Sequence, residues 1–273
     1  MRLVFPLLFL FIFSCNQKSD QEGHETENTS EQAVDTFTYR SFAVNDSISL
    51  LEDMPDGPMF RYDYGGLVFT NGTDAFQKMV ADTTNSADSM LTAAGGDYEQ
   101  AERMRMRQLF EEYRNEEVEQ ELLENASVAY ERAIDEQYTV VHNKGGVLTV
   151  QGSYYAYMGG AHGIYGTIYR SFTDQPARIL GLEEVMVSGF DRAQLGEMIK
   201  SRIDQMEDRL YDPEQPLDPT MNMGLFAEGI KFNYQPYEIG PYAAGEIEVS
   251  IPYTELLEAG LLRPEIIQMM EEK

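Results

Sequence analysis

The chain has 273 residues, and its 47 acidic and 20 basic side chains give a formal net charge of −27 at pH 7. This charge repels nucleic acid and anionic lipid head groups, so both are poor partners for the folded body. It attracts cationic proteins and divalent cations instead, although a role in solubility alone would also account for it. Hydrophobic residues make up 42% of the chain, which is sufficient for a core, so the sequence describes a globular protein rather than a disordered one.

The first residues predict export and lipid anchoring. The apolar run Leu3–Phe13 has the length of a secretory signal core and is too short to span a bilayer, which takes roughly 20 apolar residues. It leads into Ile12-Phe13-Ser14-Cys15, which resembles a bacterial lipobox, and this cysteine is the only one in the chain. We therefore expect residues 1–15 to be a lipoprotein signal peptide that ends at Cys15, the lipidated residue. An ordinary signal peptide, or a buried helix with an incidental thiol, is the alternative.

A lipidated protein of this kind is expected in the bacterial cell envelope, where each buried methylene of its lipid contributes about 0.8 kcal/mol to anchoring. Asn16 rather than aspartate follows the cysteine, which favours the outer membrane. Residues 16–35 are polar and almost free of large apolar side chains, so they are predicted to be a disordered tether. The exported body then has no cysteine left for a disulfide and depends on packing alone.

Short strands and turns open the folded body. Alternating side chains predict strands at residues 37–39 and 48–50, and the cluster Pro55–Pro58 predicts a turn. A further strand is expected over residues 62–69, and Asp74 is expected to cap the helix that follows it.

The strongest helical signal runs from Asp97 to Glu136. This segment lacks glycine and proline, and most of its apolar residues recur at steps of three and four, which is typical of an amphipathic helix. Its many glutamate and arginine side chains are interpreted as a solvated face. The sequence therefore predicts one long helix in the N-terminal half.

After this segment the hydrophobic period changes to two. A hairpin is predicted around Asn143–Gly146, with strands over residues 147–157 and 164–172. The later elements are predicted in chain order as a loop at 173–178, an apolar segment at 180–187, a helix at 191–210, a connector at 211–219, two strands within 224–234, a strand at 247–253 and a short helix at 254–259. This pattern indicates an α+β fold with antiparallel sheet and segregated helices, divided into domains at 36–170 and 171–273.

Two motifs carry a resemblance to a known family. Tyr157–Gly163 reads Tyr-Met-Gly-Gly-Ala-His-Gly, and Tyr237–Gly245 reads Tyr-Glu-Ile-Gly-Pro-Tyr-Ala-Ala-Gly. Together and in this order, they resemble the exported PdaC-like and RsiV-like domain pair, an N-terminal domain of unknown function followed by a C-terminal one. The resemblance extends over residues 36–260.

The resemblance implies an envelope protein that binds a protein or a cell-wall component. RsiV-type ectodomains bind lysozyme, and PdaC-type proteins act on peptidoglycan through a separate catalytic domain. We expect neither the membrane span of an anti-sigma factor nor a deacetylase domain in this chain. The first hypothesis is thus a non-enzymatic protein that binds a cationic partner such as lysozyme. The alternatives are a peptidoglycan or glycan binder, and an uncharacterised hydrolase or metal protein.

The candidate binding residues come from the second motif. Tyr237 and Tyr242 could form an exposed aromatic platform, with Glu238 as a charge partner. In the other interpretation, the prolines and glycines around them shape a packed loop whose tyrosine rings are buried. Five further motif residues are interpreted as structural, with at least one of the first motif's glycines in a conformation forbidden to residues with a β-carbon: Gly159, Gly160, His162, Gly163 and Gly245.

Catalytic and metal sites have less support in the sequence. His142 and His162 could bind zinc together with Glu238 or Asp174 if the fold brought them together. A serine nucleophile paired with His162 also stays open, although no spacing favours one. No HExxH or GxSxG motif occurs, and Cys15 is assigned to the lipid. The sequence thus predicts no catalytic residue, no metal and no cofactor.

Overall fold

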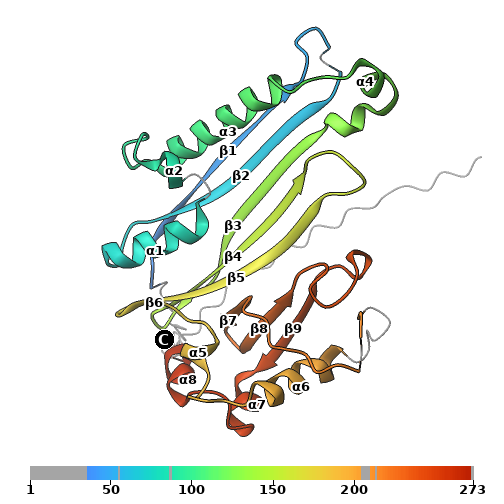
Figure 1. The fold of residues 1–273 in the computed structure, drawn as a ribbon. Coiled ribbons are helices and arrows are strands. Elements are labelled where there is room, and N and C mark those ends of the chain that lie inside the picture. Colours follow the sequence, from blue (N-terminus) through green and yellow to red (C-terminus); the bar gives the residue numbers. More distant parts are fainter. Residues whose placement is uncertain (1–35, 55, 86–87, 204–209, 213, 272–273) are drawn as a thin grey trace, which may run out of the picture. The chain divides into compact units, whose positions relative to one another are not determined.

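The computed structural model describes residues 36–54, 56–85, 88–203, 210–212 and 214–271. The predicted signal peptide, Cys15 and the tether lie outside these residues. The described elements form a mixed α+β fold with a large sheet and a small sheet, as the sequence predicted (Figure 1). Among the described helices, none is both long and apolar enough to cross a membrane.

The large sheet has six strands in the order in which they occur along the chain. They are β1 (Tyr39–Ser49), β2 (Met59–Phe69), β3 (Arg132–Lys144), β4 (Val147–Tyr157), β5 (Ile164–Asp174) and β6 (Ala177–Ile179). All neighbours are antiparallel except β2 and β3, which are parallel. The two short strands predicted at 37–39 and 48–50 are wrong as separate elements, because one continuous strand, β1, pairs with β2 along its whole length.

The β3–β4 hairpin confirms the predicted turn. Gly145 and Gly146 lie between the strands with φ angles of 59° and 73°, and two positive angles in a row are what a tight hairpin turn needs. The strand that follows covers Val147–Tyr157, as predicted from the period of its side chains.

The connection from β2 to β3 contains helices that lie along one face of the large sheet (Figure 1). Its elements are α1 (Asp74–Thr84), α2 (Asp88–Leu91), α3 (Tyr98–Arg114), α4 (Gln120–Ala126) and the 3₁₀ helix η1 (Ser127–Tyr130). The cap of α1 is Thr73, whose side chain accepts a hydrogen bond from the backbone N–H of Phe76. The prediction that Asp74 caps this helix is therefore wrong, and Asp74 is instead the acidic residue of the first turn.

The long helix predicted over Asp97–Glu136 is confirmed only as far as Arg114. Asn115 ends α3, and both its backbone N–H and its side-chain amide donate to the carbonyl oxygen of Glu111. Residues 132–137 form strand instead, because they pair with β2 on one side and β4 on the other. These non-local hydrogen bonds override the local helix propensity of their alanine, arginine and glutamate residues.

Aromatic side chains join α3 to the sheet. The ring of Phe60 on β2 lies edge-on to Phe110 and Tyr113 on α3, with centroid distances of 5.3 and 5.5 Å. Further along β2, the Tyr62 hydroxyl donates a hydrogen bond to the fully buried Glu102, which also accepts one from Arg105. The buried charge is thus paired with a cation, as a carboxylate in a protein interior requires.

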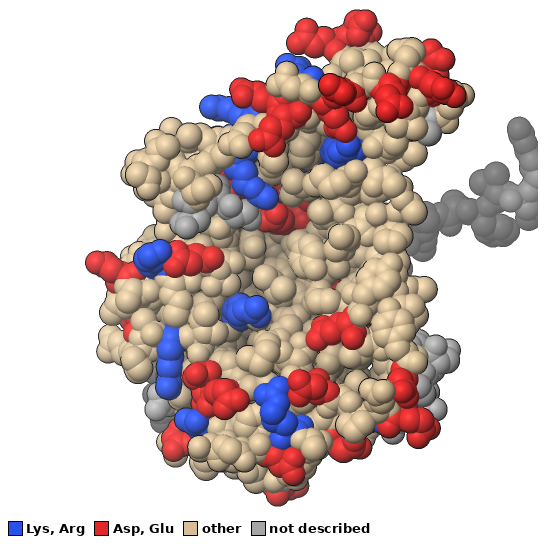
Figure 2. Space-filling view, in the orientation of Figure 1, with Lys and Arg blue, Asp and Glu red and all other residues tan. Residues whose placement is uncertain are grey.

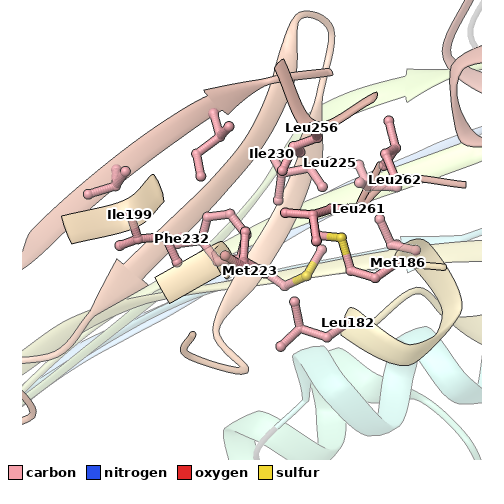
Figure 3. Packing of buried hydrophobic residues seen from close by; sticks show 14 of the residues in the cluster. Leu182, Met186, Ile199, Met223, Leu225, Ile230, Phe232, Leu256, Leu261 and Leu262 are labelled. Atoms are coloured by element: carbon pink, nitrogen blue, oxygen red, sulfur yellow. The ribbon is translucent and has the colours of Figure 1, made fainter. Parts of the chain in front are cut away.

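The C-terminal part packs a small antiparallel sheet against short helices. The sheet has the order β7 (Met223–Phe226), β8 (Gly229–Tyr234) and β9 (Ile247–Pro252), and the helices are α5 (Leu182–Val185), α6 (Arg192–Ile203), α7 (Tyr253–Glu258) and α8 (Pro264–Glu271). Figure 3 shows apolar side chains of these elements, among them Ile199, Leu225, Phe232 and Leu256, gathered in one buried cluster. The helix predicted at 191–210 is described only as far as Ile203, and α8 was not predicted.

Polar side chains connect the small sheet to the part of the β5 edge that β6 leaves unpaired. Asn222 accepts a hydrogen bond from the backbone N–H of Tyr169 at 2.8 Å and donates to the carbonyl oxygen of Thr167 at 2.7 Å. Asn233 donates to the same carbonyl oxygen at 2.9 Å. The predicted division after residue 170 falls inside β5 and stays a prediction. These contacts fix the position of the segment that connects β8 to β9, which carries the second sequence motif.

Candidate binding site: a tyrosine–histidine cluster

The structure brings the two sequence motifs together. The hydroxyl of Tyr237 lies 3.3 Å from Nε2 of His162, and the ring of Tyr242 stacks on the same imidazole with a centroid distance of 4.1 Å. Two strand residues, Tyr155 and Tyr165, complete the group. We call these five residues the tyrosine–histidine cluster.

Glycines shape the loop that carries His162. Gly159 has a φ of 79°, and a β-carbon at this position would lie 2.2 Å from the carbonyl oxygen of Ala129. Gly160 also has a positive φ, 107°, and its carbonyl oxygen accepts a hydrogen bond from the Tyr157 hydroxyl at 2.7 Å. A β-carbon on Gly163 would meet the Tyr155 ring at 2.5 Å, so this glycine lets the loop approach the cluster closely.

Hydrogen bonding assigns the tautomer of the neutral His162 ring. Its Nδ1 lies 3.0 Å from the carbonyl oxygen of Gly163, which can only accept, so Nδ1 carries a proton. In the neutral ring, Nε2 is then the acceptor for the Tyr237 hydroxyl. The arrangement makes the imidazole a flat, hydrogen-bonded surface on which Tyr242 stacks.

Tyr237 combines exposure with backbone strain. It is the one residue other than glycine with a positive φ among the described parts of the chain, at 74°, and its side chain is 54% exposed. The left-handed region costs a residue with a β-carbon about 1–2 kcal/mol. Because an exposed ring returns little packing energy, the strain points to a use of this side chain other than stabilising the fold.

Tyr242 joins the loop to the sheet. Its ring lies edge-on to Tyr165 with a centroid distance of 5.5 Å, and Tyr165 is the direct cross-strand partner of Tyr155. Desolvation, followed by the neighbouring tyrosine phenols, raises the pKa of the Tyr242 hydroxyl above its usual range. Tyr155 and Tyr165 were missed in the sequence, although alternation along β4 and β5 puts both side chains on one face of the sheet.

Glu238 lies at the surface beside the cluster. Its carboxylate accepts a hydrogen bond from the backbone N–H of Gln235 at 2.8 Å, which closes the turn that holds Tyr237 in place. Gly245, with a φ of 72°, ends the same segment, and a β-carbon there would lie 3.5 Å from the Tyr165 hydroxyl. The packed-loop interpretation thus applies to Tyr242, which is partly covered. The exposed-platform interpretation applies to Tyr237, which faces solvent.

The two histidines of the folded body lie at opposite ends of β4. His142 pairs with Thr149 near the β3–β4 turn, and His162 follows the other end of the strand at Tyr157. Eight strand residues separate these positions, or about 27 Å at roughly 3.4 Å per residue. Asp174 lies at the His142 end and Glu238 at the His162 end, so the zinc site considered from the sequence does not form. Within the described ranges, no group of three or more potential ligands could hold a metal ion.

Comparison with known proteins agrees with the order of the two motifs. Residues 56–165 match the family described as deacetylase PdaC, and residues 185–254 match the family described as a protein of unknown function, DUF3298. The PdaC-like part of the resemblance is therefore confirmed, while the RsiV part stays an expectation. No curated protein matches the chain.

Two crystal structures share the fold. A DUF3298 family member from Bacteroides fragilis has a TM-score of 0.69 and 22% identity, over 89% of this chain and 100% of its own. A DUF3298 family protein from Pseudomonas aeruginosa has a TM-score of 0.54 and 17% identity, over 84% of this chain and 96% of its own. At these identities the likeness concerns the fold alone. The chain is thus similar to a PdaC-type segment followed by a DUF3298-type segment, on a fold that DUF3298 family proteins share.

Proposed function

We propose that this chain is a lipid-anchored binding protein of the cell envelope, and that the tyrosine–histidine cluster recognises a basic protein. The observation that carries the proposal is Tyr237, an exposed aromatic side chain held on a strained backbone and oriented by His162. Rigid tyrosine rings are frequent anchors of protein interfaces, where a few such residues supply most of the binding energy. Lipidation of Cys15 would hold the body at the membrane, with the outer membrane as its site.

Charge favours a basic partner over an acidic one. The chain carries a formal charge of −27, and Glu238 supplies a carboxylate beside the exposed ring of Tyr237. Tyrosine faces also attract lysine and arginine side chains through cation–π interactions. A small basic protein such as lysozyme, the partner that the RsiV resemblance implies, offers both kinds of contact.

Catalysis has weaker support than binding. The name deacetylase PdaC suggests a hydrolytic reaction, which needs an activated water or nucleophile. Nδ1 of His162 donates to the backbone carbonyl of Gly163 rather than to a carboxylate, so no carboxylate orients this ring as a base. The stacked Tyr242 further covers one face of the imidazole.

Titration calorimetry with two ligands tests this function. Lysozyme should bind at about 0.02 M salt and bind more weakly at about 0.5 M, because charge steering is screened. Soluble peptidoglycan fragments should give no heat. If the fragments bind with little salt dependence and lysozyme does not bind, the glycan-binding alternative replaces the proposal.

A further inference from the structure

A second surface feature lies at the other end of the same loop. Met158 begins the loop that carries His162, and its side chain is 52% exposed. It borders a groove of about 290 Å³ between α3 and the sheet, together with Phe60, Leu109 and Tyr113. Four of the seven residues that line the groove are therefore apolar, and the other three are Glu112, Glu116 and Arg132. Its volume gives space for a large aliphatic or aromatic side chain.

Glutamates line the rim of this groove. Glu112 and Glu116 both border it, and only Glu116 has a cationic partner, Arg132, at 2.7 Å. The carboxylate of Glu112 accepts a hydrogen bond from the neutral Gln108 side chain. Among the residues that the structure describes, Glu112 thus has no cationic partner, and its carboxylate borders the groove beside the apolar side chains.

The surroundings of the groove are acidic as well. Residues 111–124 contain seven glutamates and a single basic residue, Arg114, which is itself paired with Glu52 at 3.5 Å. Figure 2 shows acidic side chains gathered over the end of the molecule that carries α4. The negative potential of these glutamates attracts cationic groups and repels acidic ones, so it favours a basic partner for the groove.

We propose that this groove binds a basic amphipathic segment of a partner protein. One large aliphatic side chain of the segment enters between Leu109 and Met158 and covers Phe60 and Tyr113. Lysine or arginine side chains on either side of it contact Glu112 and the glutamates of residues 111–124. This site uses none of the five residues of the tyrosine–histidine cluster, so it is valid or wrong independently of the function proposed above.

The test uses two synthetic peptides and fluorescence anisotropy with the full chain. The first probe is an amphipathic peptide of lysine and leucine, and the second has every leucine replaced by serine. The leucine peptide should bind at least about tenfold more tightly, because a leucine side chain that enters the groove is removed from water and a serine side chain gains little there. Equal affinities would show that negative charge alone attracts the peptides, and would overturn the proposal.

Matched variants locate the site. Met158→Ser and Glu112→Gln should each weaken binding of the leucine peptide several-fold. Met221→Ser and Glu228→Gln remove the same groups from exposed positions elsewhere and should have no effect. If the Met158 and Met221 variants bind equally well, the groove is not the site. Tyr237→Gly should leave peptide binding unchanged, and a loss there would assign the peptide to the cluster instead.

Discussion

Replacing Tyr237 by glycine or by alanine separates the strain of its backbone from the use of its side chain. Both variants lose the hydrogen bond to His162 and the contact with the Tyr242 ring. Only glycine relieves the left-handed conformation, because alanine keeps the β-carbon that makes a φ of 74° unfavourable. The relief of about 1–2 kcal/mol is partly offset by the greater freedom of glycine in the unfolded chain, about 0.5–1 kcal/mol.

We therefore expect Tyr237→Gly to be more stable than Tyr237→Ala by about 0.8 kcal/mol, the difference between the middle values of these two ranges. In urea this corresponds to a midpoint shift of roughly 0.3–0.5 M for a slope of about 2 kcal/mol per molar. Tyr39, which is exposed on β1 without a positive φ, provides the control. There the order should be reversed, because glycine weakens a strand relative to alanine. An alanine variant at position 237 that equals or exceeds the glycine variant in stability would show that the left-handed backbone at Tyr237 carries no strain.

Three further predictions concern other parts of the chain. Cys15→Ser should abolish lipidation and release the protein from membranes or leave a precursor; wild-type fractionation of the variant would contradict the anchoring proposal. Gly159→Val should lower the free energy of unfolding by about 1–3 kcal/mol, because the new side chain meets the carbonyl oxygen of Ala129. Gly160→Ala should lower it less, because the space around Gly160 is open. Urea denaturation measures both losses. Burial lowers the pKa of the His142 imidazole from its usual value of 6.5. The unfolded chain therefore protonates this ring at a higher pH than the folded chain does, and the free energy of unfolding should fall as the pH drops below about 6.5. His142→Gln should reduce that acid-induced loss, and an unchanged pH profile would rule out His142 as its source.

The elements that the sequence predicts correctly are those with strong local signals. Two adjacent glycines and alternating side chains define the β3–β4 hairpin, so its turn and the bounds of β4 follow from local rules. The first half of β3 shows the opposite case. Ile134 is buried there between residues with ordinary helix propensity, and its strand conformation depends on partners in β2 and β4 that are distant in the chain.

The candidate site shows the same division. The glycine requirement at Gly159 could be predicted from the motif, because consecutive glycines indicate a backbone that residues with side chains cannot adopt. The contact between His162 and Tyr237 could not, since it depends on how polar side chains of the small sheet fasten to the edge of β5. The strain at Tyr237 has no local signal at all, because tyrosine is unusual in the left-handed region.

Hydrogen–deuterium exchange of the full chain, with and without saturating lysozyme at low salt, shows whether the tyrosine–histidine cluster is the binding surface. We predict slower exchange at residues 158–163 and 235–245 in the complex, because these two segments carry His162, Tyr237 and Tyr242 of the tyrosine–histidine cluster. Exchange in the β3–β4 turn, at the opposite end of β4, should not change. Unchanged exchange in both cluster segments, whether or not protection occurs elsewhere, would contradict the claim that this cluster is the binding surface.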